Sequence, residues 1–326
     1  MRLLALTALV LAVALAGCGG QDTFLDRYVD DDGRVVRHDQ GGDTVSEAQA
    51  YAMLLAVAAD DEDRFAQVWE WTRAHLQRRD GLLASHWDDG RVVDDEPATD
   101  ADLDAARALV LAGDRFGEPR YAAEGRAIAR SIADSETAWA ADRTVLVAGP
   151  WAREQAVVNP SYWSPRAFQQ LGFDDVAASS RRLTERLLES GLPPDWARVD
   201  SSGVVASGPP SGGEPGYSFD AVRLPVRLAE SCDRADRELA ARMWPRLQHS
   251  PGAVRRALNG SPASGDEHPA ALVGAAAAAH AAGDSKASSK LLGRAAELDA
   301  EHPTYYGAAW VELGRAMLET GTLGRC

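Results

Sequence analysis

The sequence predicts an all-α protein whose helices close into an (α/α)6 barrel, and three observations support this prediction. First, apolar residues recur at spacings of three and four along most of the chain, which is the period of amphipathic helices. Second, the predicted helices come in pairs, in which an almost entirely apolar helix precedes an amphipathic, charged one. Third, the apolar members begin near residues 47, 100, 161, 218, 269 and 304. Six such pairs closed into a ring form an (α/α)6 barrel.

Turn and stop signals separate the predicted helices from one another. These signals are Asp60-Asp61, Gly117, Gly172, Gly191, Gly283 and Pro303. The helices are expected over residues 46–59, 62–78, 100–116, 118–134, 164–172, 174–190, 218–230, 233–248, 268–282, 284–299 and 304–319. Residues 22–29 are a candidate for a twelfth, short helix.

The apolar helix of each pair is expected to lie inside the ring, with its amphipathic partner outside. Residues 48–59 and 270–282 are apolar nearly all round, whereas residues 62–79 and 285–300 carry charges on one face. An open helical-repeat solenoid would produce similar pairs. The inner helices start about 35 to 60 residues apart, however, which is too loose a spacing for the common short repeats.

One segment stands out from the helical pattern by its composition. Residues 193–216 are rich in Pro, Gly and Ser, and they are expected to form a long loop of the kind that often carries function. Nothing in composition or spacing divides the chain beyond residue 17. We therefore expect residues 18–326 to form a single domain.

Residues 1–17 are expected to be the signal peptide of a lipoprotein. The apolar run 3–16 follows Arg2, and it is too short and too close to the N-terminus for a stable membrane span. The sequence Leu-Ala-Gly-Cys at 15–18 resembles a bacterial lipobox, where the peptide is cut before a cysteine that carries lipid. The alternative is an ordinary signal peptide followed by a chance cysteine. We expect lipidation of Cys18 and an extracytoplasmic protein that is anchored to the cell membrane by this lipid only.

The composition is acidic, with 34 Lys and Arg against 49 Asp and Glu and a formal net charge of −15. Loss of residues 1–17, which contain Arg2 and no acid, leaves 33 basic against 49 acidic residues, or −16. This charge argues against nucleic acid or anionic lipid as a partner, and it is compatible with a neutral polysaccharide. Cys232 and Cys326 are able to pair outside the cytoplasm, although free thiols are an equal alternative. No metal-ligand spacing occurs, so neither metal nor cofactor is expected.

Polar clusters occupy the starts of the predicted inner helices, where a ring would bring them together. They span residues 46–53, 98–102, 159–162 and 217–225. Each cluster also suits a helix N-terminus, because Ser46 and Thr99 are suitable N-caps and acids interact favourably with the helix dipole there. Glu47 and Asp220, however, precede nearly continuous apolar sequence. A carboxylate at the head of a buried helix is costly unless it has a function.

In this order and with these gaps, the clusters resemble glycoside hydrolase family 8, which includes endoglucanases, xylanases and chitosanases. The resemblance runs from about residue 24 to residue 227 and includes the Ser-Glu motif at 46–53, the Ala-Thr-Asp motif at 98–102 and the Tyr-x-x-Asp-Ala-x-Arg motif at 217–223. The fold of that family is an (α/α)6 barrel, in agreement with the helix count. The resemblance implies hydrolysis of a β-1,4-linked glycan, with a glucan favoured over xylan and chitosan.

The resemblance also implies roles for individual residues. Glu47 would be the proton donor, Asp220 the base that activates a water, and Asp100 the contact to the sugar at the cleavage point. Three further residues are expected to bind substrate: Trp87 by stacking on a pyranose face, Tyr162 by lining the cleft and Arg223 by orienting the region of the base. Inversion is implied, and it requires the two catalytic carboxyl groups to stand roughly 6.5–9.5 Å apart.

Three positions depart from the family pattern. Ala48 and Ala101 replace a usual glycine, and Val226 stands where a tryptophan often follows the proline. These differences concern substrate and rate rather than fold. The alternative function is a lipid-anchored glycan-binding or scaffold protein on the same barrel, without catalysis. With either function we expect a monomer whose partner is a polysaccharide or oligosaccharide.

Overall fold

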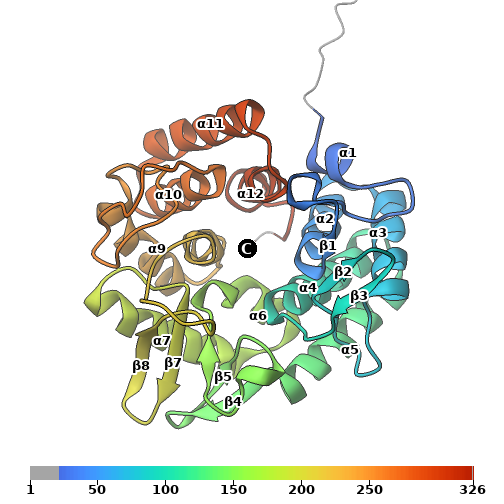
Figure 1. The fold of residues 1–326 in the computed structure, drawn as a ribbon, viewed down its shortest axis with the longest axis horizontal. Helices are drawn as coiled ribbons and strands as arrows, with labels where there is room; N and C mark the ends of the chain where they lie inside the picture. Colours follow the sequence, from blue (N-terminus) through green and yellow to red (C-terminus); the bar gives the residue numbers. More distant parts are fainter. Residues whose placement is uncertain (1–21, 325) are drawn as a thin grey trace, which may run out of the picture.

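The computed structural model describes residues 22–324 and 326, and its helices form an inner and an outer ring (Figure 1). Along the inner ring each helix packs against the next, and the last packs against the first, so the ring is closed. The inner helices are α2 (Ser46–Ala59), α4 (Thr99–Arg115), α6 (Pro165–Leu171), α8 (Leu224–Ala229), α10 (Pro269–Ala281) and α12 (Tyr305–Arg315). The predicted (α/α)6 barrel is confirmed.

A second set of helices covers the inner ring from outside. These are α3 (Glu62–His75) on α2, α5 (Pro119–Ser135) on α4, α7 (Asp174–Ser190) on α6, α9 (Arg234–Leu247) on α8 and α11 (Ser285–Glu301) on α10. The short helix α1 (Phe24–Tyr28) packs against α12 and completes the outer ring. The predicted short helix at residues 22–29 is therefore confirmed.

The position of each helix follows from its apolar residues. Helix α10 is buried at every position from Pro269 to Ala279, because α8, α9, α11 and α12 surround it. Gly274 lets α10 pack closely against the backbone at Val222, since a Cβ at Gly274 would lie 2.3 Å from the Val222 carbonyl oxygen. Helix α7 buries one face only, at the spacing of three and four that an outer helix requires: Val176, Ser179, Ser180, Leu183, Thr184, Leu187 and Leu188.

Side chains cap several of the helices, but not α2 and α4. Asp61, Ser164, Asp284 and Thr304 each accept a hydrogen bond from a backbone N–H in the first turn of α3, α6, α11 and α12. The N-cap residues of α2 and α4 are Val45 and Ala98, and neither helix has a side-chain cap. The suggestion that Ser46 and Thr99 serve as N-caps is therefore wrong, because both lie inside the first turn.

Three small antiparallel sheets contain the strands of the described residues. They are β1–β2–β3 (Thr44–Val45, His86–Asp88, Arg91–Asp94), β4–β5 (Thr137–Ala140, Arg143–Leu146) and β6–β7–β8 (Val157–Val158, Trp196–Asp200, Gly203–Ser207). The hairpin β7–β8 contradicts the prediction of a continuous loop over 193–216. It forms because Ala197 and Val199 face the core while Arg198 and Asp200 alternate with them toward solvent.

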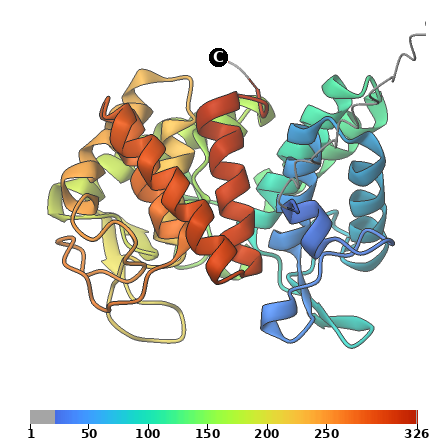
Figure 2. The same ribbon diagram turned by 90° about the horizontal axis from the view of Figure 1, so that it is seen from above.

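The loops and hairpins gather at one end of the barrel, and the C-terminus leaves from the other (Figure 2). The short 3-10 helices of the described chain are η1 (His38–Gln40), η2 (Pro150–Ala152), η3 (Pro160–Tyr162) and η4 (Ala221–Arg223). A π-helical turn, η5 (Ala316–Thr320), follows α12. The predicted helix 218–230 is in fact η4 followed by α8, which places Pro225 in the first turn of α8, where its missing N–H costs no hydrogen bond.

Two kinds of bond tie distant helices together. Arg107 of α4 is fully buried, and its Nη1 lies 3.0 Å from Oε2 of Glu230, directly after α8. Cys232 and Cys326 form a disulfide with a Cα–Cα distance of 5.3 Å, which attaches the last residue to the α8–α9 connection. The suggested pairing of the two thiols is therefore confirmed.

Two further predictions concern the membrane. Within residues 22–324 and 326, no helix has the length and apolar character that crossing a bilayer requires. The predicted signal peptide over 1–17 and the predicted lipid site Cys18 lie outside the described residues, so both remain predictions.

Candidate active site

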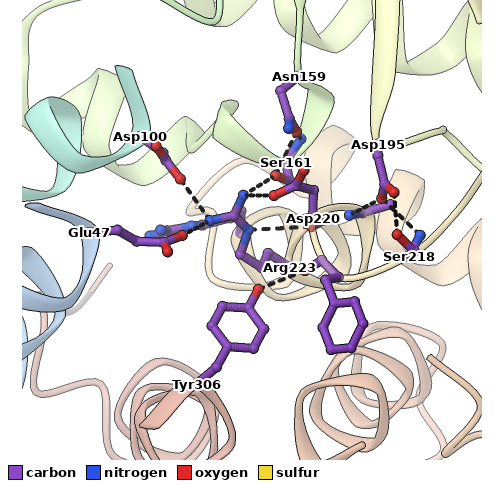
Figure 3. A network of polar contacts seen from close by, with 12 residues as sticks. Glu47, Asp100, Asn159, Ser161, Asp195, Ser218, Asp220, Arg223 and Tyr306 are labelled. Carbon is purple, nitrogen blue, oxygen red and sulfur yellow. Dashed lines mark hydrogen bonds and ion pairs between the residues drawn. The ribbon is translucent and has the colours of Figure 1, made fainter. Parts of the chain in front are cut away.

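A single buried guanidinium joins the three carboxylates that the sequence singles out. Arg223 is 1% exposed; its Nη1 lies 2.7 Å from Oδ2 of Asp100 and also contacts Oε1 of Glu47. Its Nη2 lies 2.6 Å from Oδ1 of Asp220. Figure 3 shows these acids arriving from different directions around the arginine. The predicted residues Glu47, Asp100, Asp220 and Arg223 therefore form one constellation.

The fold produces this convergence because each acid lies in the first turn of an inner helix or shortly before one. Glu47 is in the first turn of α2, Asp100 is in the first turn of α4, and Asp220 directly precedes η4. Arg223 closes η4, one turn beyond Asp220. When the inner ring closes, the three chain segments meet at the loop end of the barrel (Figures 1 and 2).

Neutral groups complete the surroundings of the guanidinium. Arg223 Nη2 donates to Oγ of Ser161 at 2.9 Å, and Nη1 donates to the hydroxyl oxygen of Tyr51 at 3.1 Å. The Tyr51 hydroxyl in turn donates to Oε1 of Glu47 at 2.8 Å. The ring of Tyr162 lies 5.3 Å from the guanidinium carbon, at cation–π distance. Tyr162 is thus part of the constellation, and its contact here is with Arg223.

The exposure of the three carboxylates differs in a way that bears on their roles. The side chains of Glu47 and Asp220 are 22% and 32% exposed, whereas that of Asp100 is 7% exposed. Glu47 and Asp220 both line a cavity of about 400 Å³, and Asp100 does not. The first two acids are therefore accessible to a ligand in that cavity, and Asp100 lies deeper.

Burial and negative neighbours perturb two of these acids. Burial raises the pKa of Asp220 to about 6 against the opposing effect of Arg223, and the charges of Asp195 and Asp100 contribute to the rise. Burial raises the pKa of Asp100 to about 7, again against Arg223, with Glu47 adding to the shift. Burial is the larger cause for both acids, and repulsion among the acids adds to it because one guanidinium cannot neutralise three carboxylates.

Asp195 holds the segment that carries Asp220. Its Oδ1 accepts hydrogen bonds from the backbone N–H groups of Ser218 and Ala221, each at 2.8 Å, and its Oδ2 accepts one from the Ser218 hydroxyl. Asp195 lies in the 193–216 segment, which the sequence marked only by its composition. Its position directly before β7 was not predicted, because the strand itself was not.

An aromatic wall on the cavity was also missed by the sequence analysis. Phe219, His268, Tyr305 and Tyr306 line the cavity beside Glu47 and Asp220. The Tyr306 hydroxyl donates to the carbonyl oxygen of Phe219 at 2.6 Å (Figure 3). Burial lowers the pKa of His268 to about 4, so its ring is neutral at neutral pH. The available signal was the pair Tyr305-Tyr306 at the start of the last inner helix, where the other polar clusters also lie.

Trp87 occupies a different position from the other predicted binding residues. It lies on β2, opposite Thr44 of β1, and it does not line the cavity of Glu47 and Asp220. The Arg34 guanidinium lies 4.2 Å from the centre of its ring, and Trp71 packs edge-on against it at 5.4 Å. The structure therefore does not bring Trp87 to the three carboxylates, and its sugar-stacking role stays a prediction.

The three departures from the family pattern lie away from the cavity. Ala48 and Val226 are fully buried in the hydrophobic core, Ala101 is 1% exposed, and none of the three lines the cavity. Their side chains therefore do not crowd a ligand at Glu47 and Asp220. Within the described residues, no group of His, Cys, Asp and Glu has the arrangement of a metal site.

Comparisons with known proteins agree with this geometry. A family model described as Glycosyl hydrolases family 8 matches residues 1–318. The probable endoglucanase of Novacetimonas hansenii is 34% identical over 221 residues, which cover 62% of this chain and 64% of that protein. The endoglucanase of Cellulomonas uda is 29% identical over 251 residues, which cover 70% of this chain and 69% of that protein. The chain thus matches somewhat less than two thirds of the length of the first relative.

Solved structures show the same fold. The endo-β-1,4-glucanase of Acetobacter xylinum superposes with a TM-score of 0.74 at 27% identity, covering 90% of this chain and 96% of that one. A family 8 endoglucanase from Klebsiella pneumoniae has a TM-score of 0.76 at 24% identity, covering 89% of this chain and 96% of that one. These similarities extend over nearly the whole barrel.

Proposed function

Because this chain belongs to family 8 of the glycosyl hydrolases, we propose that it hydrolyses a β-1,4-linked glycan, with a glucan favoured, as an inverting endo-acting enzyme. One observation carries the proposal: two partly exposed carboxylates, Glu47 and Asp220, line an aromatic cavity and are held by the same arginine. Two carboxyl groups that flank a glycosidic bond are what its acid–base hydrolysis requires. The names of the relatives, which are endoglucanases, support a glucan as substrate.

In the proposed reaction the two accessible carboxyls divide the work. Glu47 donates a proton to the glycosidic oxygen, which is a poor leaving group until it is protonated. Asp220 accepts a proton from the water that attacks the anomeric carbon from the opposite face of the sugar. Since burial raises the pKa of Asp220 to about 6, this group is mostly ionised at neutral pH and still basic enough to activate water.

Arg223 and Asp100 prepare the site rather than exchange protons with substrate. Arg223 contacts both reacting carboxylates and so fixes their relative position. Asp100 is bound to the same guanidinium and is nearly inaccessible, so it reaches only a sugar that sits deeply at the cleavage point. The aromatic wall formed by Phe219, Tyr305 and Tyr306 offers apolar ring faces to a pyranose.

The decisive experiment is a screen for new reducing ends on soluble β-1,4-glucan, xylan and chitosan. Glucan is expected to be cleaved fastest, and proton NMR of fresh product is expected to show the α-anomer first, because inversion of a β-linkage produces it. Initial β-anomer would contradict inversion. Binding of glucan without any release of reducing ends would instead support a glycan-binding or scaffold protein.

We also propose that the protein is an extracytoplasmic lipoprotein, anchored through Cys18 and acting as a monomer. The Leu-Ala-Gly-Cys sequence at 15–18 supports the anchor. The disulfide between Cys232 and Cys326 supports an oxidising compartment, since such bonds are rare in the cytosol. A polymeric substrate that cannot enter the cell is consistent with that location.

A further inference from the structure

We infer that the protein has a second binding site for a neutral glycan chain, on the outer side of the barrel and separate from the cleavage site. The site is a groove of about 940 Å³ between α7, the β4–β5 hairpin and the β7–β8 hairpin. Its lining residues include none of those that line the cavity of Glu47 and Asp220. Figure 1 shows these hairpins on the part of the ring away from α1 and α11.

An exposed tryptophan marks this groove as a ligand site. Trp139 of β4 lines it and is 73% exposed, the largest exposure among the large apolar side chains of the described residues. An indole ring left in solvent has no stabilising role in the fold, whereas a flat aromatic face is the surface on which a pyranose ring stacks. The groove volume lies within the range of ligand-binding clefts.

The charges of the groove favour a neutral ligand that is rich in hydroxyl groups. Five arginines and four carboxylates line it, a nearly balanced set in a chain whose net charge is −15. The side chain of Arg182 makes no hydrogen bond or ion pair with another described residue, and the carboxylates of Glu154 and Glu185 accept no hydrogen bond from one. The Arg198 side chain makes no hydrogen bond either, and its charge acts on Asp200 across the groove lining. Free donors beside free acceptors match sugar hydroxyls, which both donate and accept, better than they match an anion.

A smaller pocket lies beside the groove. A neighbouring pocket of about 310 Å³ shares Gln155 and Arg198 with the groove and contains Trp151. The Trp151 ring lies 6.3 Å from that of Trp196, which directly follows Asp195, the residue that holds the Asp220 segment. Because the groove and the cavity of Glu47 and Asp220 share no lining residue, only a polymer long enough to span both can bind at both, whereas a short oligomer occupies one at a time.

This inference rests on the proposed function, because it assigns the same class of polymer to both sites. The direct test is native gel electrophoresis in soluble β-1,4-glucan, with Glu47→Gln used throughout to prevent cleavage. In this background, the further substitution Trp139→Ala is expected to weaken the affinity for the polymer, measured as retardation in the gel, on the order of tenfold. That is the loss expected for one aromatic contact at a binding site. Arg182→Ala is expected to weaken it in the same direction. Val205→Ala, an exposed apolar position on β8 outside the groove lining, is the matched control.

Kinetics separate failure of this inference from failure of the proposed function. In an otherwise unchanged enzyme, Trp139→Ala is expected to lower the ratio of activity on long glucan to activity on a short glucose oligomer several-fold, mainly through KM. Equal retardation of the Trp139→Ala and Val205→Ala proteins would overturn the second site while leaving hydrolysis intact. Retardation by a carboxylated glycan but not by neutral glucan would overturn the assignment of a neutral ligand. Absence of hydrolysis on every glycan would reject the proposed function instead.

Discussion

Asp195 accepts a 2.8 Å hydrogen bond from the backbone N–H of Ala221, the residue that follows the proposed base Asp220. The two residues lie on different segments, one before β7 and the other in η4. Asp195 therefore influences the base in two ways. It fixes the backbone that carries Asp220, and its negative charge helps to raise the pKa of Asp220.

The substitution Asp195→Asn is expected to separate these two effects. The amide oxygen can still accept the backbone hydrogen bonds, but the negative charge is lost. The pKa of Asp220 should then fall below about 6, so the acidic limb of the kcat/KM profile should move to lower pH. Asp195→Ala should in addition lower kcat on the order of tenfold, because the segment loses its anchor. An Asp195→Asn profile identical to that of the wild type would show that the charge does not act on the base.

The substitutions Glu47→Gln and Asp220→Asn are each expected to lower kcat by on the order of a hundredfold or more, because each removes a proton-transfer group. Circular dichroism should show an unchanged helical fold. Glu62→Gln, in the exposed first turn of α3, is the matched control and should leave kcat unaltered. Nearly full activity of Asp220→Asn would place the base elsewhere, with Asp195, Asp200 and Glu214 as the acids to examine next.

The raised pKa of Asp100 predicts a pH dependence of stability. In the folded protein this carboxyl keeps its proton up to about pH 7, whereas in the unfolded chain it loses the proton near pH 4. The stability that it contributes is thus fully present below about pH 4 and is lost as the pH rises through 7. In Asp100→Asn the free energy of unfolding should decline less steeply over this interval. Urea titrations at several pH values, with exposed Asp134→Asn as control, test this; equal slopes would contradict it.

The disulfide between Cys232 and Cys326 is expected to stabilise the closed ring, because it constrains an unfolded chain over a separation of 94 residues. The double substitution Cys232→Ser and Cys326→Ser should lower the free energy of unfolding by about 2–4 kcal/mol. Denaturant titration of the oxidised protein, the reduced protein and the double variant measures the effect. Equal midpoints for all three would exclude a stabilising role.

Lipidation of Cys18 is expected to direct the wild-type protein to membranes and into detergent, facing outward. Cys18→Ala should be either released from the membrane or retained as unprocessed precursor. Fractionation with N-terminal sequencing of the mature protein checks both outcomes. A wild-type protein found wholly in the medium, with an N-terminus other than residue 18, would exclude the lipoprotein proposal.

The sequence by itself determined the helices, their pairing and the acids of the site. Helix α7 was predicted at its observed bounds. Its apolar periodicity and the glycines that flank it, Gly172 and Gly191, are local features that can be read directly from the sequence. Glu47 and Asp220 stood out because nearly continuous apolar sequence follows each, and Asp100 because the Ala-Thr-Asp motif resembles that of the family. The strands of the β4–β5 and β7–β8 hairpins were missed, since segments of four or five residues leave too little periodicity to detect.

Only the tertiary structure decided how these residues meet. The sequence assigned Arg223 to the region of the base, whereas closure of the ring makes it a partner of Glu47 and Asp100 as well. Closure likewise brings Tyr306 of α12 to Phe219, and folding of β1 against β2 leaves Trp87 under Arg34. The physical reason is common to these cases: helix formation depends on neighbours along the chain, whereas a contact across the barrel exists only after distant helices have packed.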